Sequence, residues 1–322
     1  MKSLETITEF GTGIVYLSDL NKKIETGEIN DVIMFSETMH EKRIAELADQ
    51  IVSEGKHIVL VAGPSSSGKT SFTKRLCMHL WINGRKPIYL GTDDYFIARD
   101  KMKVDENGNK NFENLDALDL DLFNKQLSDL LAGKLVDIPR FDFMSGNPVF
   151  GERQTQAHEG QMIVVEGIHG LNPELTADIP DEEKFRIFIA PMTEPKIDDK
   201  HKIQTSDIRK IRRMVRDNAH RGWDVITTLS TWENIRNGEY ENILPYKDNA
   251  DALFDSSLPY ELAALKPYAL PLLEKVELGN QWYPEAQRMI DILSKVDALQ
   301  DETYIVGDSI LREFVGGSII VK

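Results

Sequence analysis

The sequence of 322 residues has one cysteine, fewer basic than acidic residues, and no long apolar run. The single thiol, Cys77, excludes an intramolecular disulfide and a cysteine metal cluster. The 38 lysines and arginines against 53 aspartates and glutamates leave a net charge of -15, which argues against a broad surface for nucleic acid or anionic lipid. No run approaches membrane-spanning length and the first residues lack a signal-peptide pattern, so we expect no membrane association and a cytoplasmic protein.

One polar, glycine-containing stretch stands out against this background. Residues 63–70 spell GPSSSGKT, which matches GxxxxGK[ST] at every fixed position. Glycines let such a loop fold tightly round an anion, with backbone N–H groups pointing inward and a helix beginning where the loop ends. The apolar run before it (residues 57–62) and the helical apolar spacing after it predict strand, loop and helix in the required order.

The residues of this loop have separate expected tasks. Lys69 is expected to reach the β- and γ-phosphates of a triphosphate, and the Thr70 hydroxyl to take a place on Mg²⁺. ATP with Mg²⁺ is the expected ligand, and GTP remains open. The predicted nucleotide-binding residues of the loop are Gly63, Ser65, Ser66, Ser67, Gly68, Lys69, Thr70 and Ser71.

Further apolar strand candidates alternate with helical patterns along the chain. They cover residues 87–90, 162–165, 185–189 and 252–254. The alternation predicts an α/β fold of the P-loop NTPase type, with a doubly wound, mostly parallel sheet flanked by helices. Ligands of such sheets lie at the carboxyl ends of the strands, where the polar residues of GPSSSGKT, TDD (92–94) and EG (166–167) follow directly.

Other segments lie outside this strand and helix alternation. Residues 135–160 contain the turn signal SGNP and predict a hairpin excursion from the core. We expect a helical N-terminal segment at residues 1–50, a P-loop domain at 51–278, and a helical C-terminal extension at 279–322.

Carboxylates at two strand ends are candidates for chemistry. Asp93 or Asp94 could accept a proton from an attacking hydroxyl, bind Mg²⁺, or cap a helix, and we favour Asp93 as the functional one. Glu166 is predicted to complete a magnesium site with Thr70 and Asp93, the alternative being a glutamate that bonds local amides. His169 could contact substrate or be structural.

A cluster of arginines breaks the acidic pattern of the chain. Its members are Arg209, Arg212, Arg213, Arg216 and Arg221. Helical spacing places several of them on one side of a helix, and we predict a lid at residues 205–222 whose guanidinium groups stabilise a transferring phosphoryl group. The alternatives are a solvated helix face that pairs with Asp207 and Asp217, or contact with RNA, which the acidic composition disfavours.

Taken in order, these motifs resemble the uridine kinase and phosphoribulokinase group of P-loop kinases over nearly all of residues 56–275. The matching pieces are GPSSSGKT, TDDYF, NFENLDALD (111–119), IPRFDF (138–143), VVEGIHG and RRMVRDNAHRG (212–222). The resemblance implies ATP-dependent phosphorylation of a nucleoside 5′-hydroxyl, in a family whose members are often homodimers or homotetramers.

The resemblance also implies roles for individual residues. Asp93 matches the catalytic aspartate, Glu166 the magnesium-side glutamate and Arg213 an arginine that contacts the substrate ribose, whereas Arg216 and Arg221 match lid arginines at the nucleotide. We therefore predict a catalytic set of Lys69, Asp93, Arg213 and Arg216. The predicted substrate-binding residues are Asp93, Glu113, Phe141 and Arg213.

Departures from the family pattern fall in the acceptor pocket. Glu113 stands where an aspartate is usual, Phe141 and Gly146 where a tyrosine and a histidine read the pyrimidine, and Thr231 where a glutamine is usual. Phosphoryl transfer is therefore better supported than uridine itself. A sugar phosphate or pantothenate as acceptor, and a nucleotide-dependent switch or RNA-associated module, remain open.

A closer resemblance is to longer uridine-kinase-like proteins of bacteria, in which a kinase module follows regions similar to the N-terminal part of threonyl-tRNA synthetase. It rests on FDFMSGN, EGIHGLNPEL (166–175), LPYELAALKPYALPLL (258–273) and SILREFVGGS (309–318). It implies that residues 1–50 resemble the end of a preceding region, and that the chain is either the kinase part of something larger or a natural short form.

Overall fold

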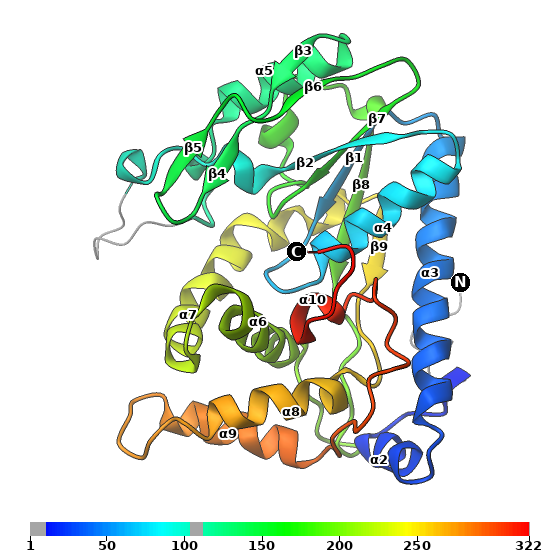
Figure 1. Ribbon diagram of the computed structural model, residues 1–322, viewed down its shortest axis with the longest axis vertical. Helices are drawn as coiled ribbons and strands as arrows, with labels where there is room; N and C mark the ends of the chain where they lie inside the picture. Colours follow the sequence, from blue (N-terminus) through cyan, green and yellow to red (C-terminus); the bar gives the residue numbers. More distant parts are fainter. Residues whose placement is uncertain (1–10, 104–111, 322) are drawn as a thin grey trace.

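A computed structural model describes residues 11–103 and 112–321. Its centre is a five-stranded sheet of order β2-β7-β1-β8-β9, in which every neighbouring pair is parallel (Figure 1). The strands are β1 (Ile58–Ala62), β2 (Pro87–Gly91), β7 (Met162–Glu166), β8 (Lys184–Ala190) and β9 (Ala252–Asp255). This sheet confirms the predicted α/β P-loop fold, and all five predicted strands lie within it.

The central strands are mostly apolar because both faces of the sheet are covered, with charged residues only at Glu166 of β7 and at Lys184 and Arg186 of β8. Alternate residues of β1 enter two different cores: Val59 and Val61 pack with α3 (Ile29–Ser53) and α4 (Lys69–Ile82), whereas Ile58 and Leu60 pack with α5 (Leu120–Leu131). The carboxyl ends of the strands therefore form one open edge between two helical layers, as the doubly wound pattern requires.

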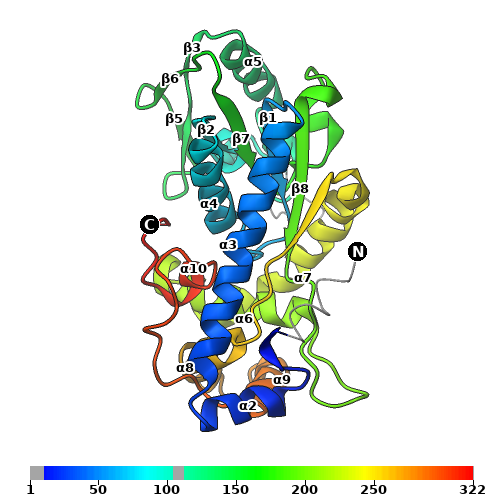
Figure 2. The same cartoon turned by 90° about the vertical axis from the view of Figure 1, so that its right-hand side faces the viewer.

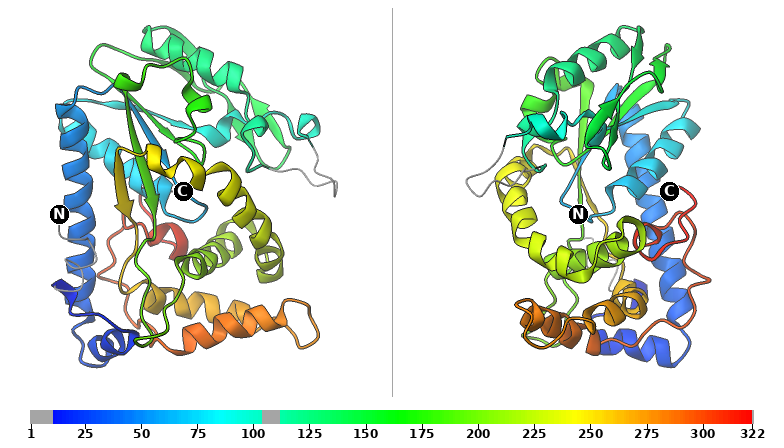
Figure 3. Two further views of the ribbon diagram at one scale, coloured as in Figure 1. Left: turned by 180° about the vertical axis from the view of Figure 1, so that it is seen from behind. Right: turned by 60° about the vertical axis from the view of Figure 1, so that its left-hand side comes forward.

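The remaining helices lie beyond the carboxyl edge of the sheet or flank it. They are α2 (Leu17–Glu25), α6 (Thr205–Arg221), α7 (Val225–Asn242), α8 (Glu261–Leu273), α9 (Tyr283–Ser294) and α10 (Arg312–Val315). Figure 3 shows α8 and α9 as a layer on the side of α6 and α7 that is away from the sheet. In the described part of the chain no helix is long and apolar enough to span a bilayer.

The segment expected to be a hairpin excursion is an antiparallel ribbon at the top left of Figure 1. Its outer pair is β3 (Leu135–Asp137) with β6 (Gln154–Gln156), and its inner pair is β4 (Arg140–Asp142) with β5 (Asn147–Val149). The ribbon packs against α5 and the turn after β2, so it borders the open edge of the sheet.

The N-terminal and C-terminal segments share one hydrophobic core with the P-loop region. Helix α3 runs alongside α4 (Figure 2), and Ile44 and Leu47 pack into the same cluster as Phe72. The C-terminal extension is helical only in α9 and the short α10, and residues 295–311 between them form turns and irregular backbone. This stretch contains the turn-forming residues Asp297, Asp301, Gly307 and Asp308, which explains why the helical expectation was only partly right.

Candidate active site

The loop between β1 and α4 has backbone that only particular residues allow. Gly68 adopts φ +87°, and Ser66 is the non-glycine residue with positive φ in the described chain. A Cβ on Gly63 would lie 1.9 Å from the carbonyl oxygen of Ile189, so the first glycine is required by close approach to β8. The loop is thereby held as a concave turn of the kind that presents N–H groups to an anion.

Lys69 and Thr70 begin α4 at the inner end of this loop. The Lys69 ammonium donates to the carbonyl oxygens of Gly63 (3.0 Å) and Pro64 (3.1 Å), which places its charge across the loop. The Thr70 hydroxyl donates to Glu166 Oε2 at 3.2 Å, and the Tyr89 hydroxyl donates to the same oxygen at 2.8 Å. The contribution of Tyr89 was not predicted, since a tyrosine on a strand is usually a packing residue.

The oxygen atoms of Thr70 and Glu166 fit a magnesium ion in chemical type. Among residues 11–103 and 112–321, no three His, Cys, Asp or Glu side chains form a metal-binding group. A Mg²⁺ ion here would therefore take few protein ligands and complete its shell with phosphate oxygens and water, as Mg²⁺ commonly does. Burial raises the pKa of Glu166; Lys69 opposes this shift, and the carboxylate of Asp93 adds to it.

The two tandem aspartates after β2 have different surroundings. Asp94 accepts a hydrogen bond from the Phe141 backbone N–H (3.2 Å) and pairs with Arg153 (2.9 Å), so it fastens the ribbon to the sheet. Asp93 instead lines the open edge, where its side chain is reachable by solvent. Desolvation by the surrounding protein raises the pKa of Asp93. The positive charge of Lys69 lowers this pKa most, followed by the charges of Arg221 and Arg216.

Two of the five clustered arginines are structural. Arg209 forms a paired contact with the buried Glu239 and donates to the Ser65 carbonyl oxygen at 3.0 Å. Arg212 is fully buried, with its Nε 2.6 Å from Glu261 and a second nitrogen 2.8 Å from the Ser256 carbonyl oxygen. These two side chains support the phosphate loop and the start of α8 from behind.

The other three arginines surround one buried carboxylate. Asp217 has no exposed surface and lies 2.8 Å from Arg216, 3.2 Å from Arg213 and 3.5 Å from Arg221. Arg213 also donates to the Ser65 hydroxyl at 2.7 Å, which ties this group to the phosphate loop. Burial lowers the pKa of Arg213 to about 10. Asp217 was expected at most on a solvated face; its spacing of four residues from Arg213 and from Arg221 was the signal for the cluster.

Glu113, which was predicted to bind the acceptor, lies against α7 within the electrostatic influence of Arg213 and Lys69. Helix α7 packs on it so closely that a Cβ on Gly238 would lie 2.6 Å from the Glu113 side chain. Burial raises the pKa of Glu113 to about 7; Arg213 and Lys69 oppose this shift, and Glu239 and Asp93 add to it. The carboxyl group of Glu113 is therefore influenced by Arg213 and Lys69, two cationic side chains that also contact the phosphate loop.

The other altered acceptor positions are occupied with internal contacts. Phe141 is 3% exposed and packs in an aromatic cluster with Phe96 and Phe143, so substrate contact by its ring stays a prediction. Gly146 adopts φ +73°, and a Cβ there would come within 2.9 Å of the Arg99 side chain. The Thr231 hydroxyl donates to the Thr227 carbonyl oxygen on its own helix.

His169 is also buried in protein rather than open to the site. It is 1% exposed, and burial lowers the pKa of its imidazole to about 4. A neutral buried histidine in this position fits the structural alternative better than substrate contact.

Residues 58–262 match the model of the Phosphoribulokinase / Uridine kinase family. The chain belongs to this family. Its match spans β1 to the start of α8, and thus the phosphate loop, Asp93, Glu166 and the arginine cluster. Membership confirms the resemblance to the uridine kinase and phosphoribulokinase group and the expectation of a phosphotransferase that acts on a hydroxyl group. The resemblance to longer proteins with a threonyl-tRNA-synthetase-like part stays a prediction.

Several individual proteins are similar to parts of this chain. The chain is 27% identical over 198 residues to "Uridine kinase" of Staphylococcus epidermidis, covering 61% of this chain and 86% of that protein. It is 29% identical over 197 residues to "Uridine-cytidine kinase A" of Dictyostelium discoideum, covering 61% of this chain but only 35% of that protein. A solved structure described as "Possible Uridine Kinase from Bacillus stearothermophilus" matches with a TM-score of 0.45 and 20% identity, over 66% of this chain and 98% of that one.

Proposed function

We propose that this protein transfers the γ-phosphoryl group of ATP to the 5′-hydroxyl of a nucleoside, in the presence of Mg²⁺. The observation that carries the proposal is the position of Asp93, a solvent-reachable carboxylate that lies close enough to Lys69, Arg221 and Arg216 for their positive charges to lower its pKa against the raising effect of the surrounding protein. A general base beside a phosphate loop and guanidinium groups is the arrangement that phosphoryl transfer to an alcohol requires. The uridine and uridine-cytidine kinases among the relatives support a nucleoside as the acceptor.

The reaction assigns a separate task to each group. The acceptor hydroxyl gives its proton to Asp93 while its oxygen forms a bond to the γ-phosphorus, and the bond from that phosphorus to the β,γ-bridging oxygen breaks to release ADP. The raised pKa of Asp93 makes its carboxylate a stronger base than an ordinary aspartate. Arg213 and Arg216, held by Asp217, stabilise the negative charge spread over the transferring oxygens.

The donor phosphates are held by the loop from Gly63 to Thr70 and by Lys69. The side chains that would hold Mg²⁺ are Thr70 and Glu166, and Asp93 is near enough to Glu166 to raise its pKa. The ion supplies charge neutralisation on the β- and γ-phosphate oxygens when it is bound. Glu113 and Arg213 are the groups proposed to bind the sugar hydroxyls of the acceptor.

A second candidate keeps the reaction and changes the acceptor to a smaller hydroxyl compound such as a sugar phosphate or pantothenate. The observation that favours it is the tight turn at Gly146, where positive φ and the Arg99 side chain leave no room for a base-reading side chain. A weakened base pocket discriminates poorly among acceptors.

An acceptor screen tests both candidates. The purified protein is incubated with ATP, Mg²⁺ and single acceptors from a panel of nucleosides, sugar phosphates and pantothenate, and products are identified by mass. Asp93→Asn is the matched control, since it keeps the shape of the site and removes the base. Phosphorylated nucleoside formed only by the unchanged protein supports the proposal; slow ATP hydrolysis that no acceptor stimulates would instead indicate a nucleotide-dependent switch.

A further inference from the structure

The C-terminal segment (residues 309–315) lies directly on the phosphate loop, although it is outside the residues that match the family model. Glu313 Oε2 accepts a hydrogen bond from the Ser71 hydroxyl at 2.8 Å and another from the Ser71 backbone N–H at 3.3 Å. The Ile310 side chain packs against the loop so tightly that a Cβ on Gly68 would lie 2.3 Å from it. A carboxylate from the end of the chain therefore contacts the loop predicted to hold phosphate.

The Ser71 amide is one that an anion would be expected to use. Ser71 is the third residue of α4, so its N–H belongs to the first turn, which has no carbonyl partner within the helix. Such N–H groups, with the positive end of the helix dipole, favour a negative group. In loops of this type they cradle the α- and β-phosphates, which is why Ser71 was among the predicted nucleotide-binding residues. Glu313 places its carboxylate on one of these donors.

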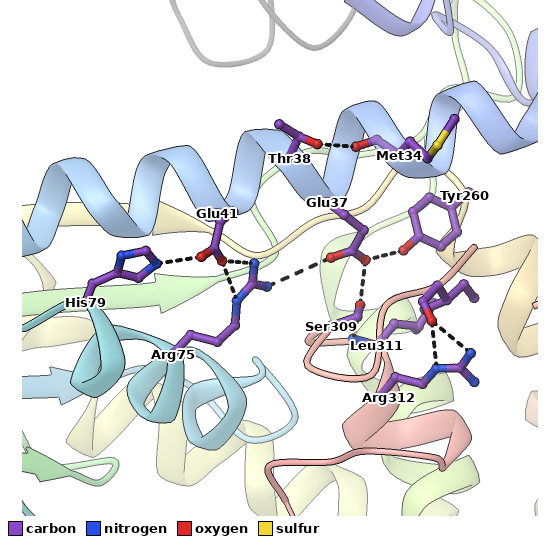
Figure 4. Close-up of polar contacts among 11 residues, drawn as sticks. Met34, Glu37, Thr38, Glu41, Arg75, His79, Tyr260, Ser309, Leu311 and Arg312 are labelled. Carbon is purple, nitrogen blue, oxygen red and sulfur yellow. Dashed lines mark hydrogen bonds and ion pairs between the residues drawn. The ribbon is translucent and has the colours of Figure 1, made fainter. Parts of the chain in front are cut away.

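Other contacts of the segment place Glu313 at the loop when the segment is docked. Phe314 is fully buried, with its ring centroid 5.2 Å from the guanidinium carbon of Arg212. Figure 4 shows Ser309 and Tyr260 both donating to Glu37 of α3. Arg312 donates to the Ile305 carbonyl oxygen at 3.0 Å. The segment thus contacts α3, α6 and α8 next to the phosphate loop. The side chain of Glu313 is partly exposed to solvent.

The charges around the loop show what this contact does. Glu313 adds a negative charge beside Glu166 and is one of the groups that raise the pKa of Glu166. A triphosphate entering the loop brings further negative charge to the same place. The carboxylate and the phosphates would therefore compete both for the Ser71 N–H and for the positive charges of the site.

We propose that Glu313 is an internal competitor of the donor nucleotide, which must displace its carboxylate from Ser71 before the phosphates can settle in the loop. The proposal rests on the donor site assigned under the proposed function. It makes the C-terminal segment a regulatory element of that site: conditions that hold residues 309–315 in place weaken nucleotide binding, and conditions that release them strengthen it. The apparent affinity for donor is then reduced by the fraction of molecules in which Glu313 has withdrawn.

The test measures nucleotide binding by calorimetry for the unchanged protein, Glu313→Gln and Glu277→Gln. Glutamine can still accept the Ser71 hydrogen bonds but carries no charge, so folding is expected to be preserved. Glu277→Gln is the matched control, since it removes one charge at an exposed position near the start of the C-terminal extension. We expect ATP and ADP to bind Glu313→Gln about fivefold more tightly, with no gain for Glu277→Gln and no gain for adenosine, which has no phosphate.

The outcomes separate this inference from the proposed function. Equal or weaker ATP binding by Glu313→Gln overturns the inference, because weaker binding would make Glu313 a support of the loop. Absence of ATP binding by both proteins overturns the donor site and the inference together. As a second measurement on the unchanged protein, amide hydrogen exchange at residues 309–315 is expected to accelerate when ATP is added; slower exchange would mean that nucleotide tightens the segment and would refute displacement.

Discussion

Asp217→Asn tests whether the arginines beside the phosphate loop act as one group held by a buried carboxylate. Asp217 is fully buried, whereas the side chains of Arg213 and Arg216 are 10% and 14% exposed. Removing one partner of a buried ion pair costs about 3–5 kcal/mol. The ion pair with Arg221 contributes little to stability because this side chain is half exposed. We therefore expect the free energy of unfolding to fall by about 3 kcal/mol, the lower limit of that range.

The same substitution is expected to reduce catalysis through misplacement of the guanidinium groups. Asparagine would present an N–H₂ group where these arginines need an acceptor, so Arg213 and Arg216 lose their fixed orientation. Removal of a transition-state donor costs about 100- to 1000-fold in kcat. Since the arginines here are displaced rather than removed, we expect kcat to fall at least about tenfold, with a smaller change in KM for ATP.

The assay compares this variant with a matched change on the same helix. Asp207→Asn breaks a paired contact with Arg288 (2.6 and 2.8 Å) that faces α9 and not the loop. Because Arg288 is 46% exposed, we expect a stability loss of about 1 kcal/mol and an unchanged kcat. Denaturant titration and steady-state kinetics of both variants give the answer. If Asp217→Asn keeps the kcat of Asp207→Asn, Asp217 is a structural residue only and the reasoning fails.

Three further predictions concern the site itself. Asp93→Asn should abolish product formation while leaving ATP binding by calorimetry largely intact; full activity would remove the assigned base. Lys69→Ala should lower kcat/KM for ATP by about 100-fold or more, and an unchanged response to ATP would mean that the loop no longer serves a donor. Because the pKa of Glu113 is raised to about 7 and its ionised form is the stronger acceptor for sugar hydroxyls, KM for the acceptor should fall as pH rises through neutrality. Glu113→Gln should flatten this profile, and a KM that rises with pH in the unchanged protein would refute the assignment.

Local patterns were sufficient to predict the phosphate loop and the strand and helix on either side of it. Strand, loop and helix follow one another without interruption at residues 58–82, so the position of Lys69 and Thr70 depends on neighbouring residues alone. The rule that ligands lie at strand carboxyl ends then brought in Asp93 and Glu166, and the contact between Thr70 and Glu166 follows from it. The magnesium, nucleotide and acceptor roles of these residues remain predictions for the experiments above.

Strand and helix patterns alone do not distinguish neighbouring residues with the same chemistry. Asp93 and Asp94 differ by one position, yet only Asp94 meets the ribbon, through Phe141 and Arg153. Arg212 and Arg213 likewise point to different sides of α6, toward Glu261 and toward Ser65. The choice depends on which element packs against which side, and the helical period alone does not contain that information.

The sequence by itself determined the phosphate loop, the order of strands and helices, and the type of reaction, since each depends on residues that are close along the chain. Only the tertiary structure decided which arginines face the loop, that Asp217 holds them, and that Glu313 contacts Ser71 across 242 residues. Such long-range contacts arise from the burial of apolar surface, here Ile310, Leu311 and Phe314. Because the hydrophobic effect is not directional, the residues next to Glu313 in the sequence do not predict which polar group its side chain will contact.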